Sequence, residues 1–155
     1  MAVTVSGLYV ANIIDVMDAT RLAIDMSLTS HKIALLSNAA TPNFSTDVSW
    51  TNTNEVAGTG WVTGGIALSA AAAGGTSTAP TNTESPTGSY MYDMADISVA
   101  STTLTSARAA RIYADALAGD NLIVLINFGA DYSTVNGTFG IQWAATGVFA
   151  WDLTP

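Results

Sequence analysis

Charged residues are scarce in this chain. Asp, Glu, Lys and Arg make up 10% of its 155 residues, against roughly 25% in ordinary soluble domains. A lightly charged surface rich in Ala, Thr, Ser and Gly is suited to burial against other subunits, because little charge has to be desolvated. The 4 basic residues (Arg21, Lys32, Arg108 and Arg111) face 12 acidic ones, which gives a net charge of −8. Nucleic-acid binding needs clustered Lys and Arg, so no direct binding to DNA or RNA is expected.

Cysteine, long apolar runs and targeting signals are also missing. Without cysteine, disulfides and thiolate metal sites are excluded. The longest apolar candidate, Leu122 to Phe128, has the length of a strand and falls short of the roughly 18 residues that a membrane helix needs. No basic region followed by a long apolar stretch opens the chain. We therefore expect a single domain over residues 1–155, soluble, made in a cytoplasm and without a membrane partner.

The C-terminal third, Asn121 to Leu153, consists of apolar segments separated by turn signals. Phe139, Ile141 and Trp143 alternate with polar or small residues, which predicts a strand with one buried face. Asn136-Gly137, between two apolar segments, predicts a hairpin turn. The sequence thus favours a mainly β protein, an antiparallel β-sandwich or barrel-like domain with a short N-terminal helix.

That helix is expected from Gly7 to about Asp18, with Ser6 as its N-cap. Its polar stripe of Asn12, Asp15 and Asp18 is narrow, which predicts a helix covered over most of its circumference.

The middle of the chain alternates between strand-like and loop-like segments. Thr41–Thr53 is polar and predicts a loop, and Gly119-Asp120-Asn121 predicts a turn. Ser69–Ser89 has no large apolar residue, so it predicts an exposed loop, or an arm that orders against a neighbouring subunit. Strands are expected at Met26–Ser37, Ile66–Leu68, Tyr90–Met94, Ile97–Val99 and Leu104–Tyr113.

Four glycines fall within the eight residues 58–65, in the segment Glu55–Gly65. The segment lacks the lysine of a phosphate-binding loop, and no clear strand precedes it. It predicts tight turns or a bulge around Trp61. Asp131, close to Gly129, is likewise interpreted as a turn residue.

Side chains with potential for chemistry are few. His31 is the one histidine, and no nucleophile or acid stands near it in the sequence, which favours a structural or solvated role. The carboxylate pairs Asp15/Asp18 and Asp93/Asp96 lack the dense oxygen spacing of a calcium loop, so solvated faces, turns and caps are expected. We predict no catalytic residue, cofactor or metal site and no enzymatic activity; a small hydrolase is the least favoured alternative.

Four tryptophans offer one other possibility. Exposed rings can form a platform on which a sugar stacks, whereas tryptophans at alternating strand positions more often pack in the core. The four are Trp50, Trp61, Trp143 and Trp151.

An ordered series of motifs resembles a group of small virion proteins of tailed bacteriophages. In that group a short N-terminal helix precedes a strand, a glycine-rich segment follows, and a hairpin closes the chain. The resemblance covers most of the chain from about residue 7. Two departures are Trp61, where the group usually has tyrosine, and the insertion at residues 69–89. The matching segments are Lys32–Ser37, Glu55–Gly65, Ala107–Tyr113, Phe128–Asp131, Asn136–Phe139 and Gly147–Phe149.

The resemblance implies a structural component of the virion, assembled in the host cytoplasm and without catalytic residues. The leading expectation is a capsid-associated protein, either a decoration or a minor capsid protein, that stabilises the shell through protein–protein contacts. Its partners would be the major capsid protein or other virion proteins, and homo-oligomers are expected. The alternatives are a tail or neck component and a carbohydrate-binding module displayed on the virion.

Overall fold

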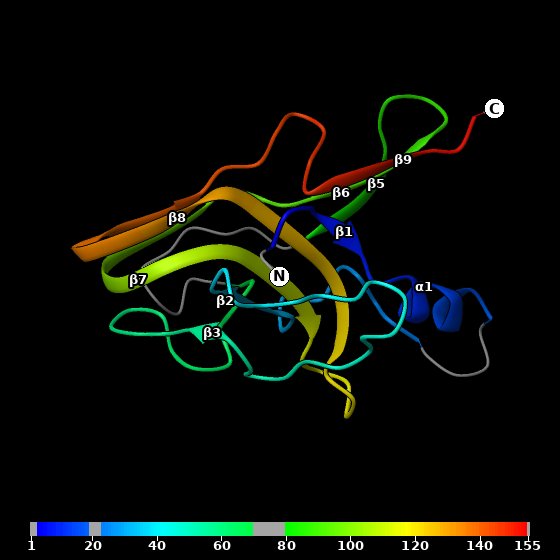
Figure 1. Cartoon of the computed structure of the whole chain (residues 1–155). Coiled ribbons are helices and arrows are strands. Elements are labelled where there is room, and N and C mark those ends of the chain that lie inside the picture. Colours follow the sequence, from blue (N-terminus) through cyan, green and yellow to red (C-terminus); the bar gives the residue numbers. More distant parts are fainter. Residues whose placement is uncertain (1–2, 19–22, 70–79, 155) are drawn as a thin grey trace.

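The computed structural model describes residues 3–18, 23–69 and 80–154. It is mainly β with antiparallel pairing and one short helix near the N-terminus, which confirms the predicted fold class (Figure 1). Within the described residues the strands form a larger sheet and a smaller one. The larger sheet contains β1 (Gly7–Leu8), β2 (Lys32–Leu36), β3 (Glu55–Val56), β4 (Ile66–Ala67), β7 (Ile97–Ala114) and β8 (Asn121–Ile141), and the smaller one β5 (Thr81–Glu84), β6 (Ser89–Asp93) and β9 (Phe149–Asp152).

The long strands β7 and β8 form the centre of the larger sheet. They pair antiparallel from Ile97 opposite Ile141 to Ala114 opposite Asn121, and both curve strongly (Figure 1). β1 pairs with the outer edge of β8, β2 with the outer edge of β7, and β3 and β4 both pair with β2. The β7–β8 pair therefore forms the centre of the sheet, with β1 at one edge of the pair and β2, followed by β3 and β4, at the other.

The predicted hairpin turn at Asn136-Gly137 is wrong. Gly137 pairs with Thr102 inside β8, and Asn136 has a φ of 47° at a shift in register. Asparagine tolerates this left-handed conformation in a bulge as well as in a turn. The turn of this hairpin lies instead at residues 115–120, where Asp120 has a φ of 45°, in agreement with the turn signal there.

The two strands expected at Ile97–Val99 and Leu104–Tyr113 are one continuous strand. Ser101 and Ser106, with φ values of 57° and 55°, interrupt the regular pairing of β7 without ending the strand. A break in apolar periodicity at these serines therefore marks irregularities within β7, because its partner β8 continues beside it.

The larger sheet is buried on both faces. In β2, Ile33 and Leu35 belong to the main core cluster, whereas Ala34 and Leu36 belong to a second cluster. The main cluster also contains Tyr92 of the smaller sheet, so it lies between the two sheets in a sandwich-like arrangement. Burial on both faces explains why β2 reads as a continuous apolar run instead of an alternating one.

The alternation near the end of β8 is confirmed for two of its three residues. Phe139 and Ile141 are buried, and Gly140 between them is exposed. Trp143 lies past the end of the strand and is half-buried; its indole N–H donates to the carbonyl of Ala95 at 3.0 Å.

The helix α1 spans Val10–Met17, three residues shorter at its start than expected. Ser6 is not its N-cap, because Gly7–Leu8 pairs with β8 as β1, and the Ser6 hydroxyl instead accepts a hydrogen bond from the backbone N–H of Asn127 at 2.8 Å. The N-cap position is occupied by Tyr9.

The predicted burial of this helix is also wrong. Val10, Ile14 and Met17 are 49%, 56% and 78% exposed, and the buried residue of α1 is Asn12. The Asn12 amide donates to the carbonyls of Val48 and Leu122 at 2.7 and 2.8 Å. A polar anchor thus attaches α1 to the sheet and leaves much of its apolar surface in solvent.

Other boundaries agree in part. β2 begins at Lys32 rather than Met26, because Ser27 donates to the Asp25 carboxylate in a local turn. The loop at 41–53 is confirmed, with only a single bridge at Ser49. The short strands expected near residues 66 and 90 are confirmed as β4 and β6.

Part of the segment expected to be an exposed loop is a strand. Thr81–Glu84 is exposed, as expected, but pairs with β6 as β5. Threonine is a good strand former, and β5 lies at the edge of the smaller sheet, where it needs no apolar side chain. Residues 70–79 of this segment lie outside the described residues.

The tight turns of the glycine-rich segment give a matched pair of variants. Gly65 and Gly129 have φ values of 77° and 78°, but a Cβ at Gly65 would meet the Ile33 carbonyl in β2, whereas one at Gly129 would meet nothing within 4 Å. Gly129→Ala should cost about 1–2 kcal/mol for its backbone conformation alone. Gly65→Ala should cost about 3 kcal/mol or more because β2 has to move. Urea unfolding measures both, and equal losses would contradict the close approach.

Candidate functional site

The single histidine lies in the protein interior. His31 is 1% exposed, and its Nε2 lies 2.7 Å from the carbonyl oxygen of Asp25, so this nitrogen carries the proton. Its buried Nδ1 has no hydrogen-bond partner among the described residues. Burial lowers the pKa of the His31 imidazole, and the carbonyl and carboxylate of Asp25 oppose that effect in part. A neutral, buried ring held by a backbone carbonyl has the environment of a structural histidine.

The aspartates singled out in the sequence are dispersed. Asp96 accepts a hydrogen bond from the backbone N–H of Trp143 at 2.9 Å, and Asp18 ends α1 as its C-cap. Asp15 lies on α1 and Asp93 at the end of β6, both half-buried. In the ranges 3–18, 23–69 and 80–154, no three His, Asp or Glu side chains are grouped in a way that could hold a metal ion.

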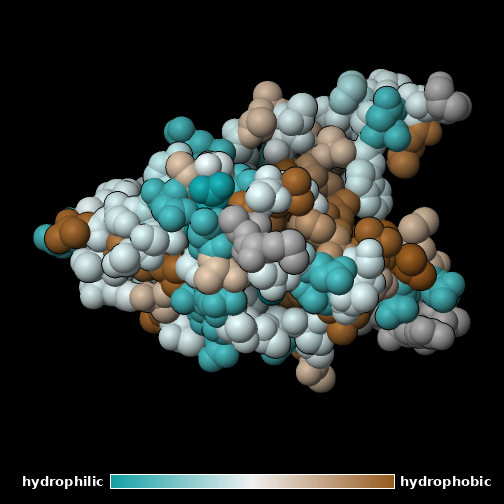
Figure 2. All heavy atoms as spheres, in the orientation of Figure 1, coloured by the Kyte–Doolittle hydropathy of each residue, from teal (hydrophilic) through white to brown (hydrophobic). Residues whose placement is uncertain are grey.

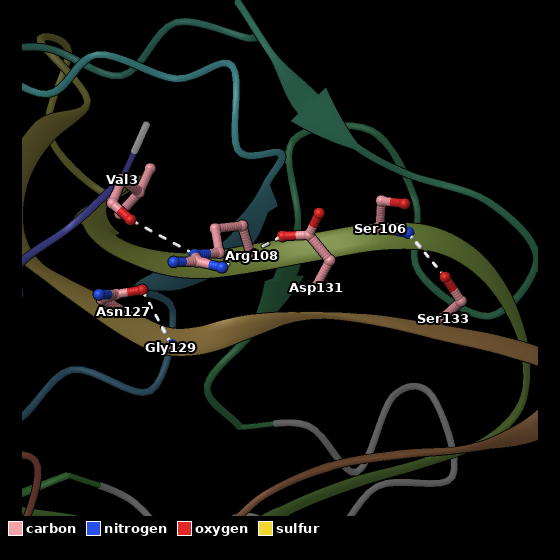
Figure 3. A network of polar contacts seen from close by, with 7 residues as sticks. All are labelled: Val3, Ser106, Arg108, Asn127, Gly129, Asp131 and Ser133. Atoms are coloured by element: carbon pink, nitrogen blue, oxygen red, sulfur yellow. Dashed lines mark hydrogen bonds and ion pairs between the residues drawn. The ribbon is translucent and has the colours of Figure 1, made fainter. Parts of the chain in front are cut away.

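Asp131 belongs to an irregular part of β8 rather than to a simple turn. It forms an ion pair of 3.5 Å with Arg108, whose Nε also donates to the carbonyl of Val3 at 3.3 Å (Figure 3). In the same figure the Asn127 side chain accepts from the N–H of Gly129, and Ser133 accepts from the N–H of Ser106. These contacts fix the place where the register of β7 and β8 shifts, which is a structural role.

The glycine-rich segment uses its own N–H groups. Gly64 donates to the Glu55 carboxylate at 2.6 Å, and Gly58 and Trp61 bond to each other through their backbones at 2.8 and 3.1 Å. A phosphate would meet a carboxylate here instead of free donors. Burial raises the pKa of Glu55, and its hydrogen bond from Gly64 works against that shift. The expectation of tight turns around Trp61 is confirmed, and that ring is fully buried.

The four tryptophans do not form one platform. Trp61 packs edge-on against Phe139 in the main core, and Trp50 stacks on Tyr113 with a ring separation of 5.0 Å at the other face of the sheet. Trp151 lies near Tyr90 and Phe149 in the smaller sheet. Core packing is thus the outcome for Trp61, while the other three are half-buried at separate places.

An apolar groove runs between α1 and the smaller sheet. Its volume is about 290 Å³. Figure 2 shows apolar surface gathered in the recess between α1 and this sheet. On its floor lie Leu122 and Ile123 at the start of β8. The groove is lined by Asn12, Ile13, Val16, Met17, Ile24, Met26, Tyr90, Leu122, Ile123, Phe149, Trp151 and Leu153.

The two walls of the groove differ in construction. One wall is the apolar side of α1, ending at Met17. The other is an aromatic trio, Tyr90, Phe149 and Trp151, whose ring centroids lie 5.9 to 6.1 Å apart. Met17 and Leu153, at 78% and 67% exposure, project at its borders. A recess so uniformly apolar is suited to receiving apolar side chains of another chain.

Sequence reasoning missed this groove although it identified the residues of α1. The apolar pattern of the helix was assigned to the core, and nothing local separates a helix side that meets a sheet from one that meets a partner. Asn12 was assigned to the polar stripe of the helix, whereas its side chain is buried and donates to the carbonyls of Val48 and Leu122.

A second, more polar hollow of about 530 Å³ lies along β8. Its aromatic residues are Phe128, Tyr132, Phe139 and Trp143, and Tyr132 is 51% exposed. Hydroxyl and amide groups line it between the rings, from Asn127, Ser133, Thr134, Thr138 and Gln142.

The burial of His31 predicts a specific pH dependence. Because its folded pKa lies below the ordinary value of 6.5, the unfolded chain takes up the proton first, and stability falls as pH drops below about 6.5. The loss is at most about 1.4 kcal/mol per pH unit. His31→Gln, which keeps an N–H donor toward Asp25, should lose less stability between pH 7.5 and 5.5 than the unmodified protein.

Urea unfolding at several pH values measures this difference. Glu55, whose pKa burial raises, contributes with the opposite sign as pH falls, but it is present in both proteins and cancels in the comparison. Identical pH profiles for the two proteins would contradict a buried neutral imidazole.

No helix in the described ranges is long and apolar enough to cross a membrane. Comparisons of the chain with protein-family models, with curated proteins and with solved structures give no match.

Proposed function

We propose that this protein is a structural component of a bacteriophage virion, associated with the capsid shell as a decoration or minor capsid protein. The ordered motif series from Lys32 to Phe149 supports the virion assignment by its resemblance to small phage proteins. The low content of charged residues, 10%, supports a surface that is covered in an assembly. The observation that carries the proposal is the apolar groove beside α1.

The groove is built for binding at low desolvation cost. Three of the lining residues carry polar side-chain atoms: Asn12, Tyr90 through its hydroxyl and Trp151 through its ring nitrogen. The Asn12 amide already donates to the carbonyls of Val48 and Leu122. The Tyr90 hydroxyl donates to the Asn82 side chain at 2.6 Å. A partner therefore displaces water mainly from apolar surface, and each large apolar side chain that becomes fully buried contributes about 1.5–3 kcal/mol.

The partner is the major capsid protein, another virion protein or a second copy of this chain. A tail or neck component would use the same groove and differ in copy number. Quantitative mass spectrometry of purified particles separates the two: a shell protein is present in many copies and a tail or neck component in few.

Met17→Asp tests the groove as the contact. The substitution places a charge at its border, where burial against a partner would leave that charge unpaired. We expect the incorporation of this variant into particles to fall by about tenfold or more, with an unchanged melting temperature because Met17 is 78% exposed.

Val135→Asp is the matched control. Val135 is 85% exposed and does not line the groove, so this variant changes charge and hydropathy in the same way at another place. If particles incorporate the Met17→Asp and Val135→Asp variants to the same extent, the groove is not the assembly contact.

The hollow along β8 favours glycan binding as a second candidate function. Tyr132 is 51% exposed and lies beside hydroxyl and amide groups, the combination that sugars need for stacking and hydrogen bonding. A carbohydrate-binding module displayed on the particle would use this surface.

Tyr132→Ala tests that candidate on a glycan array probed with the purified protein. If the hollow binds sugars, retention falls by about tenfold, whereas Trp151→Ala, which alters an aromatic residue of the groove, leaves it unchanged. No retention of the unmodified protein on any glycan would eliminate this function.

A further inference from the structure

Arg111 is a buried cation that forms no ion pair with a carboxylate of the described residues. It lies in β7 and is 6% exposed. Of the basic residues that the structure describes, Lys32 pairs with Asp115 at 3.0 Å and Arg108 with Asp131 at 3.5 Å, whereas no carboxylate lies within ion-pair distance of Arg111. Its buried Nε has no hydrogen-bond acceptor among the described residues.

Two aromatic rings hold the guanidinium in place. Its central carbon lies 5.2 Å from the ring centroid of Tyr9 and 6.0 Å from that of Trp50. Such contacts stabilise the positive charge through the faces of the rings. Burial raises the pKa of the Tyr9 hydroxyl, and the nearby Arg111 guanidinium works against that rise. Trp50 is itself stacked on Tyr113, and Tyr9 packs near Phe44, so the orientation of Arg111 is fixed by the second core cluster.

The guanidinium opens into a small polar pocket of about 200 Å³. Hydroxyl and amide groups from the loop at 41–54 line the pocket, and these groups can both donate and accept hydrogen bonds. The remaining lining residues are Ala40 and Asp47, and the polar ones are Thr41, Thr51, Thr53 and Asn54.

We propose that this pocket binds a single carboxylate group. A guanidinium presents two parallel N–H donors that match the two oxygens of a carboxylate, and the threonine hydroxyls and the Asn54 amide can donate to the remaining lone pairs. The carboxylate supplies the negative charge that a buried cation requires.

The Asp47 carboxylate selects against anions of higher charge. It lines the same pocket, and one of its oxygens accepts a hydrogen bond from the N–H of Asn43 at 2.9 Å. A doubly charged phosphate would be repelled by Asp47 more strongly than a monoanion. Chloride has the right charge but lacks the two oxygens that match the guanidinium.

Acetate is the probe. Titration of acetate into ¹⁵N-labelled protein, with chloride at equal ionic strength as the control, should give saturable shifts of the Arg111 Nε–H resonance and of the Thr51 and Thr53 amides. The expected dissociation constant is on the order of 1 mM. The proposal would be overturned if acetate, at up to about 100 times this dissociation constant, gave no saturable shift beyond the one that chloride gives.

Two variants locate the site. Arg111→Met keeps an unbranched side chain between the rings and should abolish the saturable shift; an undiminished shift would overturn the assignment. Should this variant fail to fold, Asp47→Asn decides, because it removes a like charge while keeping an acceptor for Asn43. Acetate should then bind several-fold more tightly, and equal or weaker binding would exclude the pocket.

The carboxylate could belong to a free small acid or to the side chain of another protein. A capped peptide of Gly and Ser with one central Asp distinguishes these sources. Binding of the peptide at the same resonances, at least as tight as acetate, assigns the site to a protein partner. Binding of acetate alone assigns it to a small carboxylic acid. The site does not depend on the proposed role in a virion.

Discussion

The antiparallel pairing of β7 with β8 is the constraint on which the rest of the structure depends. β1 and β2 lie on the outer edges of this pair, and β3 and β4 are added to β2. Its two faces support the two core clusters. The irregularities in the pair, at Ser101, Ser106, Gly129 and Asn136, bend it without breaking it, because each extra residue is absorbed as a bulge that increases the local twist. The curvature leaves the hollow along β8 on one side and brings the start of β8 under the groove.

Burial of the larger sheet on both faces accounts for where binding surfaces remain. One face is covered by the smaller sheet, and the other by Tyr9, Phe44 and Trp50. The short helix α1 lies at the border of this arrangement and is held by the hydrogen bonds of Asn12 rather than by its apolar residues. A helix fixed by a polar contact can leave apolar residues in solvent, as Val10, Ile14 and Met17 are. The groove follows from this anchor, since Met17 at the end of α1 stays exposed at its border.

Much of the fold was predictable from the sequence because its signals are local. The alternation at Phe139 and Ile141, the apolar run of β2 and the turns around Trp61 are each determined by side chains close in the chain. The errors at Asn136-Gly137 and Ser6 share one cause: a residue suited to a turn or cap took another role because a distant strand was available for pairing. The groove was not predictable, since it depends on how α1 and β9, at opposite ends of the chain, come together. The Arg111 pocket was hidden for the same reason, because Tyr9, Trp50 and Arg111 are adjacent only in the folded chain.

The distribution of charge ties these surfaces together. With 12 acidic residues against 4 basic ones, copies of this chain repel one another at long range, and only short-range contacts can offset that repulsion. The groove that we propose as an assembly contact would provide one through apolar burial. The proposed carboxylate site at Arg111 would provide a second kind, since a charge held between Tyr9 and Trp50 is screened less by solvent than that of an exposed lysine. The proposed site would thus place the acidic group of a ligand against the second core cluster of a chain that is itself acidic.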